Sequence, residues 1–439
     1  MASVTIHRGS HQIGGCVTEF RTEKHRIIID FGQNLPGTYK EDRISDEELL
    51  RRVFAEPADG VLFTHYHGDH IGMYKAIPEG NQMYIGATAK EILEILTARV
   101  DGIPDMAVPG LPIIRSMRTY PVGQTMRDFG DILVTPLVVD HSALDAYMFL
   151  IEIGGKRVLY TGDFREHGIA GRSFEAMIGQ YVGKVDILIT EGTMLLRRKE
   201  EQENPIRTED DLTRAASRLF RRNKRNVVLV SSTNLDSVMG FFHAVPWGMD
   251  FVCDEYQAEL ILSAIRHMGR FHAKYRRPMI HGKERRIYLV GHPKKLGCVE
   301  GCYPADFSIL NRKGYVLLAR ENHNPNLDQN RFEKILDKLN DPLIVYSKWA
   351  GYLDTAHGGY TDSYADPAVN RFIGNRRFTK LHTSGHAYAS TLEKLIRLTE
   401  PEIIIPMHTE CAEEFAGLSA FSAYQRKVRV LQDGEKYAL

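Results

Sequence analysis

The chain has 439 residues, enough for two or more domains with substantial cores, and 43% of them are hydrophobic. Lys plus Arg and Asp plus Glu both number 56, so no global charge attracts a polyanion and any nucleic-acid contact must come from local patches. The sequence has no signal-peptide core and no apolar run long enough to span a bilayer. The five cysteines are scattered, which argues against a disulfide framework, and we expect a cytoplasmic protein.

The most informative stretch follows a short apolar run at 60–63, which is typical of a buried strand that opens into a loop. This loop has three imidazoles and a carboxylate within six positions: His65, His67, Asp69 and His70. Such groups bind borderline-soft divalent ions such as zinc. Four of them are too many for one tetrahedral ion that keeps an open position, so they indicate two neighbouring ions. The alternative is a polar loop of solvated histidines. Further candidate metal ligands later in the sequence make this alternative the weaker one.

Two features near this loop predict local structure. The strand-like run 26–32 contains Asp30 near its end, which is either a carboxylate that orients the metal loop or part of a strand-end turn. Thr88 and Glu91 form a capping-box pattern before a run of apolar residues, so we expect a helix to begin there.

Three polar residues follow predicted strands in the next segment. His141 comes after the strand 132–139, Asp163 after the strand 157–161, and Glu191 after the strand 185–190. The pair Gly154-Gly155 predicts a hairpin between two of these runs. Strand ends on one rim of a sheet are where site residues collect, so we expect these side chains to meet the histidine loop.

A composition shift begins at the charged stretch 195–203, which has the character of a linker. The segment that follows starts with a helix capped at 208–211, then alternates strands and helices, as a small α/β domain does. Its most basic part is either a groove for an RNA backbone or a solvated helix face, and its basic residues are Arg266, Arg270, Lys274, Arg276, Arg277, Lys283, Arg285 and Arg286.

The pattern of strands ending at site residues returns after residue 376. A strand at 378–381 leads to His386, a capping box at 390–393 predicts a helix, and a strand at 402–406 leads to His408. We therefore expect a first domain built from 1–200 and 376–439, with 201–375 as an inserted domain.

These motifs together resemble the β-CASP branch of the metallo-β-lactamase superfamily, and the segment around His386 most resembles ribonuclease J. The histidine loop is specific for the superfamily, and the ordered trio of Glu191, His386 and His408 is specific for the branch. The resemblance implies an α/β fold, namely a metallo-β-lactamase αββα sandwich with an inserted α/β β-CASP domain. A histidine at the position of His408 goes with RNA substrates in this branch. The resemblance therefore implies an RNA phosphodiesterase.

The resemblance also assigns a role to each residue. One zinc ion would be bound by His65, His67 and His141, and the second by Asp69, His70 and His408, with Asp163 bridging both. A pair of ions about 3.5–4 Å apart activates a water and holds the attacked phosphate, and manganese is the alternative metal. His386 would be the general acid, oriented by Glu191, although another metal ligand is the alternative role for His386. The catalytic set is then Asp69, Asp163, Glu191 and His386.

In ribonuclease J the residues near this segment also hold a terminal 5′ phosphate. The corresponding residues here are His382, Ser384 and Gly385, and Ser232 and Thr233 lie in a comparable hydroxyl-rich turn. They imply trimming of 5′-monophosphorylated RNA in the 5′-to-3′ direction, and the alternative is ordinary turn hydroxyls.

Two departures from ribonuclease J leave the mode of cleavage open. That family usually carries a C-terminal domain, whereas this sequence stops at Leu439, and it commonly has aspartate where Glu191 stands. Glutamate there is more like the endonuclease subunit that cleaves pre-mRNA 3′ ends. Two competing functions are a hydrolase of small esters or lactones and a non-catalytic RNA-processing subunit of the same fold. A homodimer is compatible with the sequence, which leaves the oligomeric state open.

Overall fold

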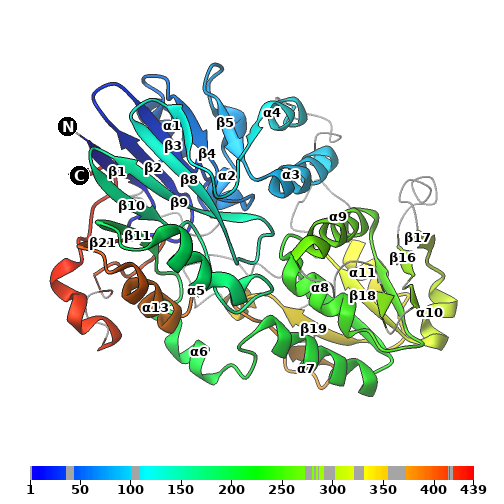
Figure 1. Cartoon of the computed structure of the whole chain (residues 1–439). Coiled ribbons are helices and arrows are strands. Elements are labelled where there is room, and N and C mark those ends of the chain that lie inside the picture. The colour runs from blue at the N-terminus through cyan, green and yellow to red at the C-terminus, as the bar shows by residue number, and fades with distance from the viewer. Residues whose placement is uncertain are drawn as a thin grey trace. The chain divides into compact units, whose positions relative to one another are not determined.

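The computed structural model describes residues 2–35, 44–100, 109–271, 279–280, 283–284, 286–290, 302–320, 331–353, 372–413, 415 and 419–439. The chain forms two compact units, one of Met1–Pro205 with Gly385–Leu439 and one of Ile206–Ser384 (Figure 1). The second boundary lies later than the position 375/376 expected from the sequence. The reason is that strand β20 (Phe378–Lys380) pairs in parallel with a strand of the second unit, so it extends that unit's sheet.

Two sheets make up the first unit. Within the described residues the first has the order β22-β1-β2-β3-β4-β5-β6 and the second the order β21-β11-β10-β9-β8-β7. The strands of the first sheet are β1 (Ser3–Arg8), β2 (Val17–Arg21), β3 (Arg26–Ile29), β4 (Gly60–Leu62), β5 (Met83–Ile85), β6 (Arg118–Thr119) and β22 (Lys436–Ala438). Those of the second are β7 (Met126–Phe129), β8 (Ile132–Val139), β9 (Ala146–Ile153), β10 (Lys156–Tyr160), β11 (Ile187–Glu191) and β21 (Ile403–Met407).

The main core lies between these sheets, because one buried cluster contains residues of both, such as Ile6, Phe20, Phe149 and Ile189. A second cluster joins the other face of the second sheet to helices α5 (Phe174–Met177) and α13 (Ala389–Thr399). Strands β3 to β6 pair in parallel, so they need crossover connections. Those connections supply helices α1 (Asp46–Val53), α2 (Gly68–Ile71), α3 (Ala87–Val100) and α4 (Leu111–Ser116). The first unit is thus an αββα sandwich, as expected from the sequence.

The second sheet brings four strand ends to one edge. Strands β9 and β10 form the predicted hairpin, and Gly154 and Gly155 at its turn both have positive φ, at 57° and 78°. Strand β8 is antiparallel to β9. Strand β11 is parallel to β10, and β21 is parallel to β11. Strands β8, β10, β11 and β21 therefore run in the same direction, and their carboxyl ends share an edge.

Helix starts were predicted with mixed success. The capping box of α7 (Glu209–Arg222) is confirmed, since Thr208 and Asp211 bond reciprocally. Helix α3 instead begins before Thr88, and two N–H groups of its first turn, those of Thr88 and Ala89, donate to Asp145 from a distant loop. Helix α13 also begins before its predicted cap, Ser390, and Tyr388 is its N-cap. A remote carboxylate can satisfy helix N–H groups as well as a local side chain, so a capping pattern is not decisive.

The second unit is built on a parallel sheet with the order β17-β16-β13-β18-β12-β19-β20 in its described part. Its strands are β12 (Arg225–Val230), β13 (Asp250–Cys253), β16 (Ile287–Leu289), β17 (Cys302–Pro304), β18 (Tyr315–Ala319), β19 (Leu343–Ser347) and β20, beside a small pair, β14 (Met279–Ile280) and β15 (Lys283–Glu284). Its other helices are α8 (Leu235–Ala244), α9 (Glu255–Phe271), α10 (Phe307–Lys313) and α11 (Arg331–Leu336).

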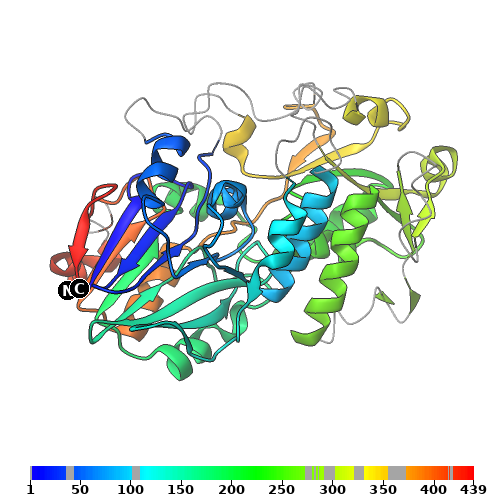
Figure 2. The same ribbon diagram turned by 90° about the horizontal axis from the view of Figure 1, so that it is seen from above.

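The stretch predicted as a linker is more ordered than its composition suggests. It forms a 3₁₀ turn at Leu195–Arg197 and helix α6 (Arg198–Glu203), and Leu195 is buried in the second cluster of the first unit. The described ends of the chain also meet within that unit, because β22 pairs antiparallel with β1 (Figures 1 and 2). In the part of the chain that the structure describes, no helix combines the length and apolar character needed to cross a membrane.

Candidate metal centre

The histidine loop and the four strand ends converge within the first unit. The loop follows β4, and its second half is helix α2 rather than irregular loop, so Asp69 and His70 lie on one helical turn. His141 follows β8, Asp163 follows β10 and His408 follows β21, while Glu191 is the last residue of β11. The shared edge of the second sheet thus presents its side chains to the loop of the first sheet.

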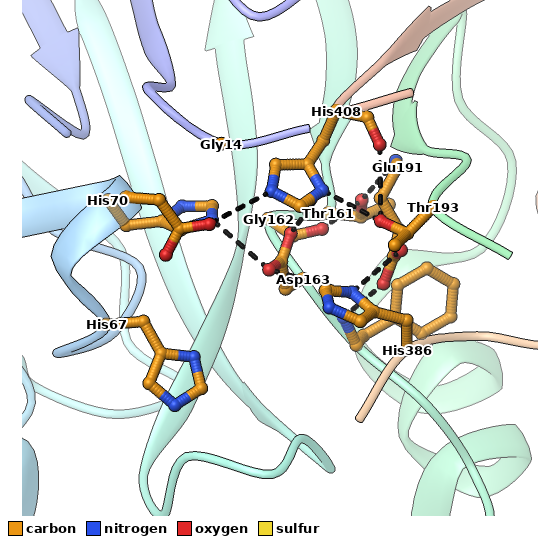
Figure 3. A network of polar contacts seen from close by, with 12 residues as sticks. Gly14, His67, His70, Thr161, Gly162, Asp163, Glu191, Thr193, His386 and His408 are labelled. Atoms are coloured by element: carbon orange, nitrogen blue, oxygen red, sulfur yellow. Dashed lines mark hydrogen bonds and ion pairs between the residues drawn. The ribbon is translucent and has the colours of Figure 1, made fainter. Parts of the chain in front are cut away.

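Asp163 lies at the centre of this cluster (Figure 3). Its Oδ2 is 3.2 Å from Nε2 of His70 and 4.0 Å from Nε2 of both His65 and His141. Its Oδ1 is 3.5 Å from Nδ1 of His408. A single buried carboxylate is therefore within reach of imidazoles from both sides of the cluster.

Unsatisfied buried atoms show that the cluster fits metal ions. Nε2 of His65, Nε2 of His70 and Oδ1 of Asp163 are buried without a hydrogen-bond partner in the described structure. Buried polar atoms are normally paired, and Nε2 of both His65 and His70 faces the carboxylate of Asp163, so these atoms could share a bound cation. Potential ligand atoms of His65, His67 and His141 lie within 4.8 Å of one another, and so do those of His65, His70 and Asp163. This nitrogen and oxygen donor set suits zinc.

Two neighbours orient the histidines of the loop. Nδ1–H of His70 donates to Oδ2 of Asp30 at 2.8 Å, and Asp30 is fully buried. The hydroxyl of Thr64 donates to the same carboxylate at 2.9 Å, and its oxygen lies 3.0 Å from Nδ1 of His65. These contacts turn Nε2 of both rings toward the cluster, as outer partners of metal ligands do. Of the two readings of Asp30, these contacts favour a carboxylate that orients the histidine loop over a strand-end turn.

The two histidines on strand ends are held in the same way. The hydroxyl of Thr193 donates to the carbonyl of His408 at 3.2 Å. Its oxygen therefore accepts from Nδ1–H of His408, which lies 2.8 Å away. Nδ1–H of His141 donates to the carbonyl of Gly385 at 2.7 Å. Sequence reasoning missed Thr193, although its place two residues after Glu191 at a strand end was a usable signal. His408 also has a positive φ of 49°, an uncommon backbone conformation that is frequent at functional sites.

His386 and Glu191 form a separate pair at the edge of the cluster. Nδ1 of His386 is 3.1 Å from Oε2 of Glu191 and 3.7 Å from Oδ2 of Asp163. Oε1 of Glu191 accepts from the backbone N–H of Phe164 at 2.9 Å, and Glu191 is buried. The side chain of His386 remains 23% exposed, so it is the member of the pair that a substrate can reach. Its ring also lies within 4.8 Å of potential ligand atoms of Asp163, Glu191 and His408, so the spacing permits a metal-ligand role as well.

The protonation states differ between the two parts of the cluster. Burial lowers the pKa of His65 and His141 well below the ordinary value and that of His67 to about 4, so these rings are neutral and able to bind a cation. Burial would also lower the pKa of His386, but the carboxylates beside it outweigh this effect and raise its pKa. Burial would raise the pKa of Asp163, yet the surrounding imidazoles lower it, so this carboxyl is ionised.

The five predicted substrate-binding residues do not belong to one unit. Gly385 lies in the first unit, where its carbonyl accepts from His141. The others belong to the second unit, at the carboxyl edge of its sheet: Ser232 and Thr233 follow β12, and His382 and Ser384 follow β20. Of the basic stretch 266–286, the residues Lys274, Arg276, Arg277 and Arg285 lie outside the described part of the chain.

Comparisons with known proteins agree with this geometry. Residues 25–237 match the model of a beta-lactamase superfamily domain, and residues 375–424 match a Zn-dependent metallo-hydrolase RNA specificity domain. Ribonuclease J of Helicobacter pylori strain B128 is 20% identical over 99% of this chain and 60% of its own length. An RNase J-like protein of Methanocaldococcus jannaschii is 24% identical over 44% of this chain and 43% of its own length. The solved structure of a protein of unknown function from Enterococcus faecalis V583 matches with a TM-score of 0.73 and 22% identity, covering 100% of both chains, which shows a shared fold.

The matched model, together with the αββα sandwich and its cluster of histidines and aspartates, places residues 25–237 in the metallo-β-lactamase superfamily. Within it, the chain is a β-CASP protein of the ribonuclease J-like kind. The chain spans 60% of the length of the curated ribonuclease J proteins that it matches.

Proposed function

We propose that the chain is a metal-dependent ribonuclease that hydrolyses phosphodiester bonds of RNA at the cluster around Asp163. The observation that carries the proposal is the partly exposed His386, held 3.1 Å from Glu191 and 3.7 Å from Asp163. A hydrolase of this kind needs a proton donor next to its metal ligands, and this pair supplies one. The RNA specificity domain matched at 375–424 contains both His386 and His408, which supports RNA as the substrate.

The cluster would hold two zinc ions. One would be bound by His65, His67 and His141, the other by Asp69, His70 and His408, with Asp163 shared between them. When bound, the ions would supply Lewis-acid activation of the attacking water and of the phosphate. The buried orphan atoms of His65, His70 and Asp163 support this assignment.

The protein's own groups would handle the leaving oxygen. Nδ1–H of His386 donates to Glu191, which leaves the Nε2–H of the protonated ring to donate to the departing 3′ oxygen. Glu191 fixes the orientation of the ring and stabilises its positive charge. A non-catalytic subunit of the same fold would have lost metal ligands, whereas all seven expected positions are filled in this chain. A small ester would not need a separate acid in this position.

The second unit would bind the 5′ end of the RNA as a monophosphate, and this would direct 5′-to-3′ trimming. Ser232 and Thr233 lie between β12 and the N-terminus of α8, where helix N–H groups favour an anion. The neighbouring strand β19 ends at Ser347, whose buried hydroxyl makes no hydrogen bond among the described residues, and the same is true of Thr383 after β20. These hydroxyls share the carboxyl edge of the sheet with His382 and Ser384.

Cleavage of RNA labelled at either end tests the proposed reaction. We expect His386→Ala to retain both metal ions but to lose about 10²–10⁴-fold in cleavage rate, the usual contribution of a general acid. His408→Ala should lower the metal content instead. His25→Ala, in which a surface histidine paired with Asp131 is removed, is the matched control and should change neither quantity. Wild-type turnover by His386→Ala would disprove the proton-donor role.

Substrates that differ only at the 5′ end test the proposed phosphate site. Wild-type protein should prefer a 5′ monophosphate over a 5′ triphosphate or hydroxyl. Because a hydrogen bond to a charged group contributes about 1.5–3 kcal/mol, Ser232→Ala should reduce that preference roughly tenfold or more. Ser116→Ala, at an exposed hydroxyl bound to the carbonyl of Ile113, is the control. An unchanged preference would mean that the turn does not bind the phosphate.

A further inference from the structure

A buried glutamine of the second unit contacts one of the serines proposed to bind the end of the RNA. Nε2 of Gln257, in the first turn of α9, donates to Oγ of Ser232 at 3.1 Å. Gln257 is 2% exposed and Ser232 9%, so solvent hardly reaches this contact. Ser232 follows β12 and Gln257 follows β13, and these strands run parallel within one sheet, so both residues lie at its carboxyl edge.

The neighbours of Gln257 fix which end of its amide faces Ser232. The backbone N–H of Asp254 points to the other end, 3.3 Å away, and because an N–H can only donate, that end must be the oxygen Oε1. The NH₂ end therefore faces Ser232, and it too can only donate. The oxygen of Ser232 accepts this bond, which is the one hydrogen bond of this hydroxyl among the described residues. Its own proton is thus available for an acceptor outside the protein.

A salt bridge holds Gln257 in this orientation. Oδ1 of Asp254 accepts from the backbone N–H of Gln257 at 2.8 Å, so the two residues bond reciprocally, as in a capping box. Oδ2 of Asp254 accepts from Nε and Nη2 of Arg320 at 2.6 and 2.5 Å. The guanidinium also lies over the ring of Tyr256, 4.9 Å from its centroid. Both the backbone and the side chain of Gln257 are therefore fixed.

A second hydroxyl at this edge is an independent sign of a ligand. Ser347 is 1% exposed, and its Oγ makes no hydrogen bond within the described residues. It pairs in register with Val230, the last residue of β12, and so lies beside the turn that carries Ser232. Buried hydroxyls normally have a partner, and a bound anion would supply one. The N-terminus of α8, which begins at Leu235, favours an anion at the same place.

We infer that Gln257 is a positioning residue, which holds the hydroxyl of Ser232 with its proton available to the terminal phosphate of the RNA. The inference rests on the phosphate site proposed above and names the residue that sets its preference for an anion. A serine hydroxyl alone can donate or accept. Because Gln257 supplies a donor to its oxygen, Ser232 is left to donate. A charged phosphate oxygen gains more from such a donor than a neutral 5′ hydroxyl does.

The competing explanation is that Gln257 only caps helix α9. Gln257→Glu separates the two roles, because a carboxylate can still accept from the backbone N–H of Asp254. The same change replaces the donor Nε2 by an oxygen, so the hydroxyl of Ser232 would donate to residue 257 instead of to the substrate. Gln257→Met removes the contact with Ser232 without adding a charge.

Cleavage of RNA with a 5′ monophosphate and of RNA with a 5′ hydroxyl distinguishes these explanations. The ratio of the two kcat/KM values does not depend on the fraction of protein that is folded. We expect this ratio to fall roughly tenfold or more in Gln257→Glu, and about 2–10-fold in Gln257→Met, which loses one neutral hydrogen bond. In a Ser232→Ala background, Gln257→Met should cause no further decrease. The control is Asp211→Asn, the opposite exchange in the capping box of α7, which should leave the ratio unchanged.

The outcomes separate this inference from the phosphate site. A wild-type ratio in Gln257→Glu, alongside a reduced ratio in Ser232→Ala, would overturn the role of Gln257 and leave the phosphate site intact. An equal decrease from Gln257→Met with and without the Ser232 hydroxyl would also overturn it, since the glutamine would then not act through that group. The same holds if Asp211→Asn lowers the ratio as far as Gln257→Glu. Wild-type protein that cleaves both substrates equally well would overturn the phosphate site, and the role of Gln257 with it.

Discussion

Replacement of Asp30 by asparagine tests how the protein orients its metal ligands. Asp30 is fully buried; Oδ2 accepts from Nδ1–H of His70 at 2.8 Å, and Oδ1 accepts from the backbone N–H of Thr64 at 2.7 Å. Asparagine has the same shape and also tolerates the left-handed backbone at this position, where φ is 60°. The substitution therefore removes the charge and one acceptor while the backbone conformation is kept.

The amide cannot satisfy both donors. If its oxygen faces His70, its NH₂ group meets the N–H of Thr64, and in the opposite orientation it meets Nδ1–H of His70. Leaving one buried donor unsatisfied costs about 1–3 kcal/mol of folding free energy. Loss of such an outer partner usually weakens metal binding about 10–100-fold, which corresponds to about 1.4–2.8 kcal/mol.

Competition with a chromophoric chelator measures this loss. We expect the binding of the ion proposed at His70 to be weakened more than that of the ion proposed at His65, because Asp30 contacts the ring of His70 directly and reaches His65 through Thr64. Asp186→Asn is the control, since Asp186 likewise accepts from a backbone N–H, that of Arg157, at the opposite end of its strand from the cluster. If Asp30→Asn binds both ions as tightly as wild type, the carboxylate does not orient the ligand.

Three further substitutions test the surroundings of the cluster. Gly32→Ala would place a Cβ 1.7 Å from the backbone oxygen of Asp69, so we expect both thermal stability and metal content to fall, and a wild-type melting temperature would contradict the close packing. Thr193→Val removes the partner of Nδ1 of His408 and should weaken metal binding about tenfold; an unchanged chelator titration would show that Thr193 does not position the ring. Arg8→Met should lower the free energy of unfolding by about 3–5 kcal/mol in urea titrations, because the fully buried guanidinium donates to the carbonyls of Gly15 and Gly32. A loss under about 1 kcal/mol would show that these hydrogen bonds do not stabilise the fold.

The sequence indicated which candidate residues lie together where these residues follow regular strands. His141, Asp163 and His408 each come directly after an apolar run, and strands that run in one direction must end at one edge. For Asp30 the sequence left two readings open, an orienting carboxylate and a strand-end turn. The positions were therefore accessible from local patterns alone, without knowledge of the tertiary contacts.

Contacts between distant segments could not be predicted in this way. Asp145 caps helix α3 across more than fifty residues, and no local pattern indicates a partner so remote. Gln257 likewise contacts Ser232 from the end of another strand, 25 residues later in the chain. The strand Phe378–Lys380 was identified correctly, but its parallel pairing with β19 decides the unit to which it belongs. Pairing partners depend on the whole fold, which a single sequence does not display.

The first unit is formed by two separate segments of the chain, which affects how the protein folds during synthesis. Its sandwich draws β21, β22 and His408 from the last part of the chain, whereas Ile206–Ser384 is continuous in sequence. Since domains emerge from the ribosome in order, we expect the inserted segment to fold before the first unit has received its last two strands, β21 and β22. Before β21 and β22 are synthesised, β11 and β1 are edge strands with unpaired backbone groups that can pair wrongly. A chaperone would therefore matter most at this stage of synthesis.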